Sequence, residues 1–148
     1  MKQSLTVLFS GLCLLFLSCF GGDKEDEFSE ITTYATQNGI KVKDTLGIFV
    51  HIDEVGTGAK PNVNNTVILY YKGYYLDDVI FDKTKDSIPL SLKLSSAIPG
   101  LQSGIGLFAK DGKGTIIIPS TKAYGDNPPF GVRKNAILVY DINIVEIN

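Results

Sequence analysis

The sequence has no tryptophan, one histidine (His51), one methionine and only two cysteines among its 148 residues. No metal-ligand spacing, glycine-rich phosphate loop or Cys/His dyad is present. His51 alternates onto the expected solvent side of a strand, which predicts an exposed residue rather than a catalytic base. The sequence therefore predicts no metal and no cofactor, and it is a poor candidate for a hydrolase or transferase.

Neither sign of charge dominates the chain. Lysine and arginine number 14, aspartate and glutamate number 16, and the formal net charge is −2. Proteins that bind nucleic acid need a basic surface to neutralise phosphates, so nucleic acid is excluded as a partner. The length suits one domain with a sizeable core.

The longest hydrophobic run, 5–17, is too short to cross a membrane comfortably and fits the apolar region of a secretory signal. Its end, Phe16-Leu17-Ser18-Cys19, resembles the lipobox of bacterial lipoproteins. The resemblance implies a signal peptide at 1–18 and an acylated, palmitate-bearing Cys19, because several acyl chains anchor a protein stably. The alternative is a plain secreted protein. Cys13 lies inside the apolar run, so no disulfide is expected.

Residues 19–44 read as a lipid-anchored flexible linker and lead-in segment. Two glycines and the acidic cluster 23–27 indicate a solvated tether. The same cluster resembles the tags that send some Bacteroidota lipoproteins to the cell surface. A short helix is expected over 28–38, with Asn38-Gly39 as its stop. These features predict a lipid-anchored protein of the bacterial cell envelope, at the outer membrane, on its periplasmic or surface side.

The rest of the chain, 45–148, reads as an α+β domain. Residues 48–53 alternate, with Phe49 on the expected solvent side. Residues 67–82 read as strand, turn and strand, with Asp77-Asp78 in the turn and both faces of the first strand apolar. Helical spacing appears over 99–108, where Gly104 and Gly106 would let the helix lie close to a sheet. With further strands at 89–94, 115–118 and 137–147, we expect an antiparallel sheet of five to six strands, locally connected, around one short helix.

Several motifs in this domain occur in a distinctive order, from Gly56-Thr57-Gly58 to Leu138-Val139-Tyr140-Asp141. Between them lie Tyr71-Lys72-Gly73, Phe81-Asp82, Ala97-Ile98-Pro99-Gly100-Leu101, Ile118-Pro119-Ser120 and Ala123-Tyr124-Gly125. In order and spacing they resemble the FKBP-type peptidyl-prolyl cis–trans isomerases. The resemblance implies the FKBP fold, a curled antiparallel sheet around a short helix, which agrees with the pattern of strands.

The resemblance also implies the residues of a substrate pocket. Its catalytic residues would be Phe81, Asp82, Tyr124 and Tyr140. The substrate-binding residues would be Tyr71, Ile98, Leu90, Leu101 at the floor and Val132 on the rim, with 127–130 overhanging the pocket. The Ile98 N–H and the Tyr124 hydroxyl would donate hydrogen bonds to substrate carbonyls. Without the resemblance, Tyr71, Phe81 and Tyr140 would read as ordinary core aromatics.

The implied reaction is rotation about Xaa-Pro bonds of exported polypeptides. Amide resonance sets a barrier of about 18–20 kcal/mol, and Xaa-Pro bonds take roughly tens to hundreds of seconds to isomerise. The twisted transition state has less charge separation than the planar amide, so a dry apolar pocket favours it without any reactive group. Macrolide ligands of the family are further expected binders.

Some positions depart from the family pattern. Leu101 stands where tryptophan is usual and Leu90 where phenylalanine is usual. Arg133-Lys134 replace a usual Pro-Pro, which predicts a basic and less rigid rim, and Asp78 replaces a usual hairpin glycine. The alternative function is therefore a non-catalytic module that binds proline segments or acts as a chaperone, within an envelope or gliding-motility complex.

Overall fold

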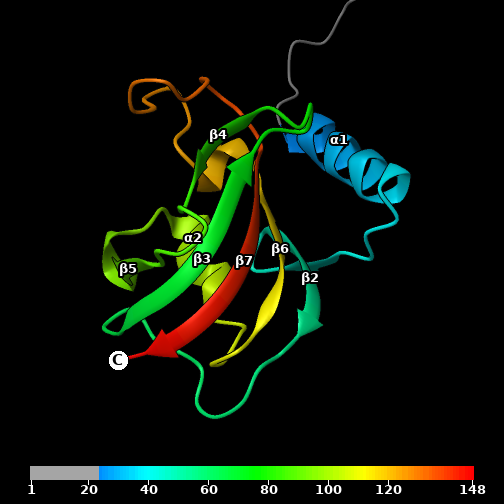
Figure 1. Cartoon of the computed structure of the whole chain (residues 1–148). Coiled ribbons are helices and arrows are strands. Elements are labelled where there is room, and N and C mark those ends of the chain that lie inside the picture. The colour runs from blue at the N-terminus through cyan, green and yellow to red at the C-terminus, as the bar shows by residue number, and fades with distance from the viewer. Residues whose placement is uncertain (1–23) are drawn as a thin grey trace, which may run out of the picture.

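The computed structural model describes residues 24–148, and the expected signal peptide and Cys19 lie outside them (Figure 1). No helix within the described part is both long and apolar enough to cross a membrane. The helices are α1 Lys24–Gln37 and α2 Pro99–Ile105, with short 3₁₀ turns η1 Leu94–Ser96 and η2 Ser120–Lys122. The strands are β1 Lys43–Thr45, β2 Ile48–Glu54, β3 Thr66–Tyr74, β4 Ile80–Lys83, β5 Leu90–Lys93, β6 Lys113–Ile118 and β7 Leu138–Ile147.

The strands form one antiparallel sheet in the order β1-β2-β6-β7-β3-β4, with β5 also paired to β3. The predicted α+β class and the curled sheet around a short helix are confirmed. The expectation of local connections is wrong, because β2 pairs with β6 and β3 pairs with β7. The sheet has seven strands because β1 joins its edge; the sequence KDT has no apolar alternation that could have revealed this strand.

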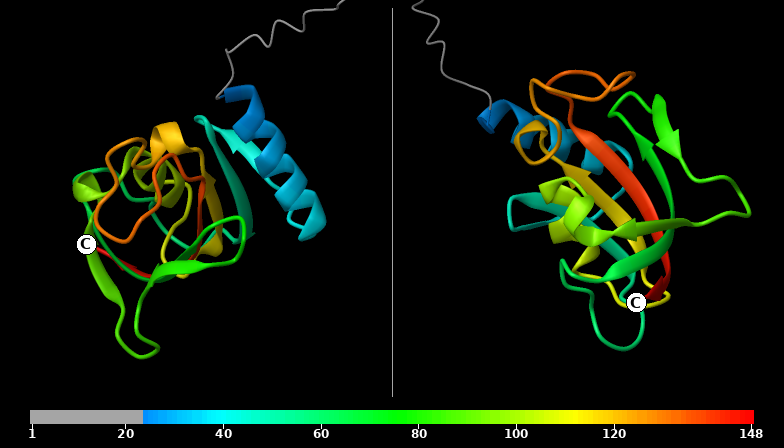
Figure 2. Two further views of the ribbon diagram at one scale, coloured as in Figure 1. Left: turned by 90° about the horizontal axis from the view of Figure 1, so that it is seen from above. Right: turned by 90° about the vertical axis from the view of Figure 1, so that its left-hand side faces the viewer.

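Two helices cover opposite faces of the sheet, as Figure 2 shows in views from above and from the side. In β6, Ile116 and Ile118 belong to the core on the side of α2, whereas Ile117 belongs to the core on the side of α1. Successive residues of a strand point to opposite faces, so a continuous apolar run is what a doubly covered strand requires.

Helix α1 begins at Lys24 rather than at the expected residue 28, so part of the predicted tether is helical. Its buried residues Ile31, Tyr34 and Ala35 pack on the outer face of the sheet. Phe49, expected on a solvent face, is only 5% exposed because α1 covers it. The predicted stop at Asn38-Gly39 is confirmed, with Gly39 at a positive φ of 66°.

Helix α2 lies very close to β6 on the concave face. A Cβ atom on Gly100 would lie 2.2 Å from Ile118 Cγ2, and one on Gly104 would lie 2.6 Å from Ile116 Cδ1. The expected role of Gly104 in close packing is therefore confirmed. Gly106 instead ends the helix as its C-cap, and its nearest neighbours are carbonyls of its own helix.

The edge of the sheet beyond β3 is made of two strands in succession. β5 pairs with 66–69 of β3 and β4 pairs with 72–74, and the chain between them, 84–89, leaves the sheet as a loop. The predicted turn between β3 and β4 is confirmed: the Tyr75 N–H donates to the Val79 carbonyl, and Asp78 has φ 62°. Both edge strands contribute residues to the concave face beside α2.

Candidate functional site

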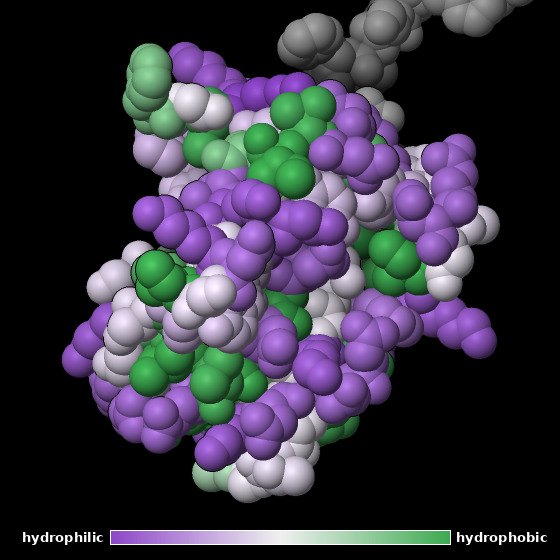
Figure 3. Space-filling view, viewed as in Figure 1, coloured by the Kyte–Doolittle hydropathy of each residue, from purple (hydrophilic) through white to green (hydrophobic). Residues whose placement is uncertain are grey.

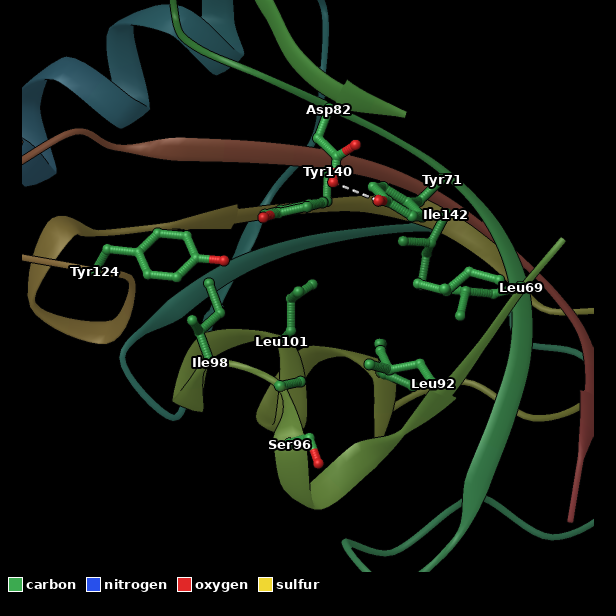
Figure 4. Close-up of a pocket in the computed structure, with 13 residues that line it drawn as sticks. Leu69, Tyr71, Asp82, Leu92, Ser96, Ile98, Leu101, Tyr124, Tyr140 and Ile142 are labelled. Carbon is green, nitrogen blue, oxygen red and sulfur yellow. Dashed lines mark hydrogen bonds between the residues drawn. The ribbon is translucent and has the colours of Figure 1, made fainter. Parts of the chain in front are cut away.

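A cavity of about 210 Å³ lies between α2 and the concave face of the sheet (Figure 4). Most of its lining is aliphatic or aromatic, and its polar groups are a carboxylate, three phenols and a serine. The thirteen residues that line it are Leu69, Tyr71, Asp82, Leu90, Leu92, Ser96, Ala97, Ile98, Leu101, Ile105, Tyr124, Tyr140 and Ile142.

Strand and helix periodicity brings these side chains together. Leu69 and Tyr71 are two residues apart on β3, and Tyr140 and Ile142 are two apart on β7, so each pair faces the same side. Leu101 on α2 and Ile105 at its end are four residues apart and share one helix face. The cavity therefore has a sheet wall and a helical base, and β5 and the segment after η2 complete its sides.

Most of the expected pocket residues do meet in this cavity. Tyr71, Asp82, Tyr124 and Tyr140 line it, together with Ile98, Leu101 and Leu90. In Figure 4, Leu101 points up from α2 toward Tyr140, and the Tyr124 hydroxyl points toward the Tyr140 hydroxyl. Residues that are more than 50 positions apart in the sequence thus share one enclosed space.

Phe81 and Val132 are not among the lining residues, which corrects their expected placement. Phe81 lies beside the wall: its ring meets Tyr140 edge-on at 5.6 Å and lies 5.0 Å from the Tyr75 ring. It therefore supports the Tyr140 ring. Val132 lies in the rim loop, where its N–H donates to the Pro129 carbonyl.

Gly73 makes this aromatic support possible. A Cβ atom at Gly73 would lie 2.8 Å from Phe81 Cζ and 3.0 Å from Tyr140 Cε1. The glycine therefore lets both rings pack against the backbone of β3. The Tyr71 ring, 6.1 Å from Tyr140, continues the aromatic wall into the cavity.

The three phenols of the cavity lie near Asp82, on β4. The Tyr71 hydroxyl donates a hydrogen bond of 2.5 Å to Asp82 Oδ2 (Figure 4). Burial raises the pKa of Tyr71, and the hydrogen bond to Asp82 raises it further. Burial also raises the pKa of Tyr124, and the negative charge of Asp82 raises it further. Burial likewise raises the pKa of Tyr140. The phenols therefore stay neutral and keep their O–H donors near neutral pH.

Arg133 contacts the turn between β3 and β4 through its guanidinium and its backbone N–H, and the expected lower rigidity of the rim stays a prediction. Its guanidinium carbon lies 4.2 Å from the centre of the Tyr75 ring, and its Nη1 lies 2.7 Å from Asp77 Oδ2. Its backbone N–H donates to the Tyr75 hydroxyl at 3.0 Å. The hydrogen bond from Arg133 holds the pKa of Asp77 below its ordinary value. These contacts join the loop to the turn between β3 and β4 without the usual prolines.

The segment 127–130 does not line the cavity, contrary to the expected overhang, and Phe130 is fully exposed. On the face drawn in Figure 3, apolar surface gathers over β4 and around β5. The exposed side chains there include Ile80, Ile88 and Leu90. Leu90 also lines the cavity, so exposed apolar surface continues from the cavity onto β5.

Six lining residues were not anticipated from the sequence. Leu69, Leu92 and Ile142 each lie two residues from an expected pocket residue on the same strand, and Ile105 lies one helical turn after Leu101. Periodicity could have found these four. Ser96 and Ala97 lie in the connection before α2, and no sequence pattern places them.

The arrangement offers enclosure and hydrogen bonds rather than reactive groups. Within residues 24–148, no group of three or more histidine, cysteine, aspartate or glutamate residues could hold a metal ion. The cavity presents neutral phenols and one carboxylate over an aliphatic base. Such a site is suited to bind an uncharged group that has a carbonyl beside it. It is also suited to promote a conformational change in that bound group.

Comparison with known proteins places this site in a family. Residues 57–145 match the family described as FKBP-type peptidyl-prolyl cis-trans isomerase. The isomerase FkpA of Escherichia coli is 33% identical over 115 residues, which are 77% of this chain and 42% of that protein. FkpA of Aeromonas hydrophila is 32% identical over 114 residues, again 42% of its length. The chain thus spans less than half of these relatives.

Solved structures agree with the sequence match. The crystal structure of FkpA from Escherichia coli has a TM-score of 0.73 and 30% identity, and covers 84% of this chain and 60% of its own. The peptidyl-prolyl cis-trans isomerase of Pseudomonas syringae pv. tomato has a TM-score of 0.69 and 27% identity, and covers 86% of this chain and 98% of its own. The chain therefore belongs to the FKBP-type peptidyl-prolyl cis-trans isomerase family.

Proposed function

We propose that this chain is a peptidyl-prolyl cis–trans isomerase that acts on Xaa-Pro bonds of exported polypeptides. The observation that carries the proposal is the cavity itself. Tyr71, Asp82, Tyr124 and Tyr140 converge there above the aliphatic side chain of Leu101.

The aliphatic part of the cavity suits a proline ring. Leu101, Ile142 and Leu69 provide apolar contacts at its base and wall. A bound ring displaces water there, and its amide enters surroundings that solvate charge poorly. The planar amide is more polar than the twisted one, so this environment lowers the rotational barrier.

Two donors at the edge of the cavity would orient the peptide. Ile98 is the N-cap of α2, so its N–H has no partner within that helix and is available to a substrate carbonyl. The Tyr124 hydroxyl, which is neutral at physiological pH, would donate to a second carbonyl. Held at both carbonyls, the peptide loses less entropy on reaching the twisted geometry.

Rates of exchange between cis and trans Xaa-Pro peptides, measured by NMR, test the proposal. We expect Asp82→Ala and Tyr124→Phe each to lower kcat/KM about tenfold, which corresponds to about 1.4 kcal/mol. Asp86→Asn, in the exposed loop 84–89, should retain the wild-type rate as a control for loss of an acidic group. A wild-type rate equal to the buffer blank would remove the proposal, and unchanged rates in both pocket variants would move the site elsewhere.

The alternative, a module that binds proline segments without catalysis, has one observation in its favour. The base of the cavity is the aliphatic Leu101, where the family usually has tryptophan. Saturable binding of a proline peptide, measured by calorimetry, together with a blank exchange rate would establish this alternative. Its wider form, a chaperone or subunit of an envelope or gliding-motility complex, then predicts co-purification with envelope proteins.

We further propose that macrolide ligands of the family occupy the same cavity. The supporting observation is the combination of an apolar cavity with phenol and amide donors at its edge. A macrolide that binds the wild type should compete with the proline peptide. If both bind at once, the two sites are different.

The location in the cell is a separate proposal. We infer that residues 1–18 are removed and that Cys19 carries the lipid anchor in the bacterial envelope, because an apolar segment ends at Leu17-Ser18-Cys19. The acidic cluster 23–27 supports export to the surface of a Bacteroidota-like outer membrane. Metabolic labelling with a palmitate analogue should mark the wild type and not Cys19→Ser; equal labelling of both would exclude this anchor.

A further inference from the structure

We propose that Glu27, in the first turns of α1, is a positioning residue for the pocket on the other side of the sheet. Its carboxylate holds the start of the segment 120–124, and this segment presents Tyr124 to the cavity. The inference rests on the proposed isomerase function, which it deepens by linking the lead-in helix to the site.

The contact joins two parts of the chain that lie 93 residues apart. Glu27 Oε2 accepts a hydrogen bond of 3.1 Å from the backbone N–H of Ser120. Ser120 is 7% exposed and is the first residue of η2, where an N–H has no partner within the helical turn. Because the acceptor is a carboxylate, this hydrogen bond is charge-assisted. Loss of this acceptor would leave a buried donor unpaired.

Ser120 in turn fixes the backbone on both sides of Tyr124. The Ser120 carbonyl accepts the N–H of Ala123 at 3.0 Å and that of Gly125 at 3.2 Å. A displacement of Ser120 is therefore passed to the residues immediately before and after Tyr124. In the cavity, the Tyr124 hydroxyl points toward the Tyr140 hydroxyl (Figure 4). A small shift of this backbone therefore changes the direction in which Tyr124 donates a hydrogen bond to a substrate.

Helix α1 gives Glu27 a fixed base. Ile31 and Tyr34 are buried against the outer face of the sheet, and the Phe28 ring lies 5.4 Å from the Phe49 ring. Figure 2 shows the start of α1 near the segment that carries η2. The carboxylate is thus held from one face of the sheet while the residue it positions lines the other.

Three variants test the proposal in the full chain. Glu27→Ala removes the acceptor, and we expect kcat/KM for a proline peptide to fall about three- to tenfold. Glu27→Gln keeps an oxygen that can accept the Ser120 N–H and should recover most of the rate. Glu30→Ala removes the same charge from an exposed position of α1 and should behave like the wild type.

Two further measurements separate positioning from general destabilisation. In a Tyr124→Ala background, Glu27→Ala should have no further effect on kcat/KM, because there is no longer a phenol to position. In the free protein, the amide signals of Ser120, Ala123 and Gly125 and the ring signals of Tyr124 should shift in Glu27→Ala and not in Glu30→Ala.

The outcomes distinguish this inference from the proposed function. An inactive wild type overturns the isomerase, whereas the NMR shifts in the free protein report the effect of Glu27 on Tyr124 without any activity. Unchanged Tyr124 signals in Glu27→Ala would overturn the inference even if the wild type is active. An equal loss of rate with and without the Tyr124 phenol would also overturn it, since Glu27 would then act only through the stability of the fold.

Discussion

At the scale of single residues, the missing side chain of Gly100 decides how closely α2 approaches the sheet. A Cβ atom there would lie 2.2 Å from Cγ2 of Ile118, which is fully buried. The next residue, Leu101, forms the base of the cavity. The glycine therefore sets the depth of the pocket as well as the packing of the core.

Gly100→Ala should lower the free energy of unfolding by about 1–3 kcal/mol, the usual cost of overpacking a core. Urea unfolding followed by circular dichroism measures this change. Ser103→Ala, on the same helix, is the control and should be close to neutral. A Gly100→Ala protein as stable as the wild type would mean that α2 lies further from β6.

Sequence periodicity alone predicts which side of a strand or helix a residue faces, whereas the resemblance to the family is what assigns the residues to one pocket. Tyr71 and Tyr140 lie on strands whose alternation fixes the side they face, and their meeting follows from the pairing of β3 with β7. Phe81 precedes Asp82 on a short strand, and its place behind Tyr140 depends on the space left by Gly73. That dependence on a partner strand is not visible in a local pattern, and the family resemblance, which implies Phe81 as a pocket residue, does not show that it lies behind Tyr140.

At the scale of elements, α1 acts as a cover for the outer face of the sheet. Its buried side chains meet Phe49, Ile117 and Val139, which come from three different strands. The helix thereby turns a one-sided sheet into one with a core on each face. Burial of the apolar sheet face that α1 covers should contribute substantially to stability, because apolar area removed from water is the main favourable term in folding.

Ile31→Ala should lower the free energy of unfolding by roughly 2–5 kcal/mol, since Ile31 is fully buried and its loss leaves a cavity. Thr33→Ala, at an exposed position of the same helix, serves as the matched control. Chemical denaturation of both variants measures the difference. Similar midpoints for the two would show that α1 does not stay packed on the sheet in solution.

The elements with strong periodicity were predictable, and the order in which they pair was not. Alternation identified β2, β3, β5 and β7, and helical spacing with Pro99 identified α2. Pairing of β2 with β6 depends on a match between surfaces more than 50 residues apart, which no local pattern contains. The edge strand β1 and the first turn of α1 are polar, so hydrophobic periodicity does not reveal them.

At the scale of the whole molecule, the tyrosines make folding sensitive to alkaline pH. Burial raises the pKa of Tyr34, Tyr71, Tyr74, Tyr124 and Tyr140 above the ordinary value of 10.0. When the protein unfolds, these phenols can ionise at their ordinary pKa. The stability they provide is therefore fully present below pH 10 and is lost as the pH rises from there toward their higher pKa values in the folded state.

We expect the free energy of unfolding to fall as the pH rises above 10, by up to about 1.4 kcal/mol per pH unit for each tyrosine that ionises only when unfolded. Urea titrations at several pH values measure this slope. Tyr74→Phe removes one such group and should make the decline shallower, which isolates the contribution of a single phenol. An identical slope in that variant would argue against a role of Tyr74.

The pairing of β2 with β6 has a practical consequence for recombinant work. The segment shared with the family, 57–145, excludes β2 and α1. A fragment trimmed to those limits would lack β2, which would leave the backbone amides on one edge of β6 unpaired. It would also lack α1, which would expose Ile117 and Val139 to solvent. Unpaired strand edges and exposed apolar surfaces promote aggregation. A fragment designed for soluble expression should therefore begin before α1 and not at the limits of the family match.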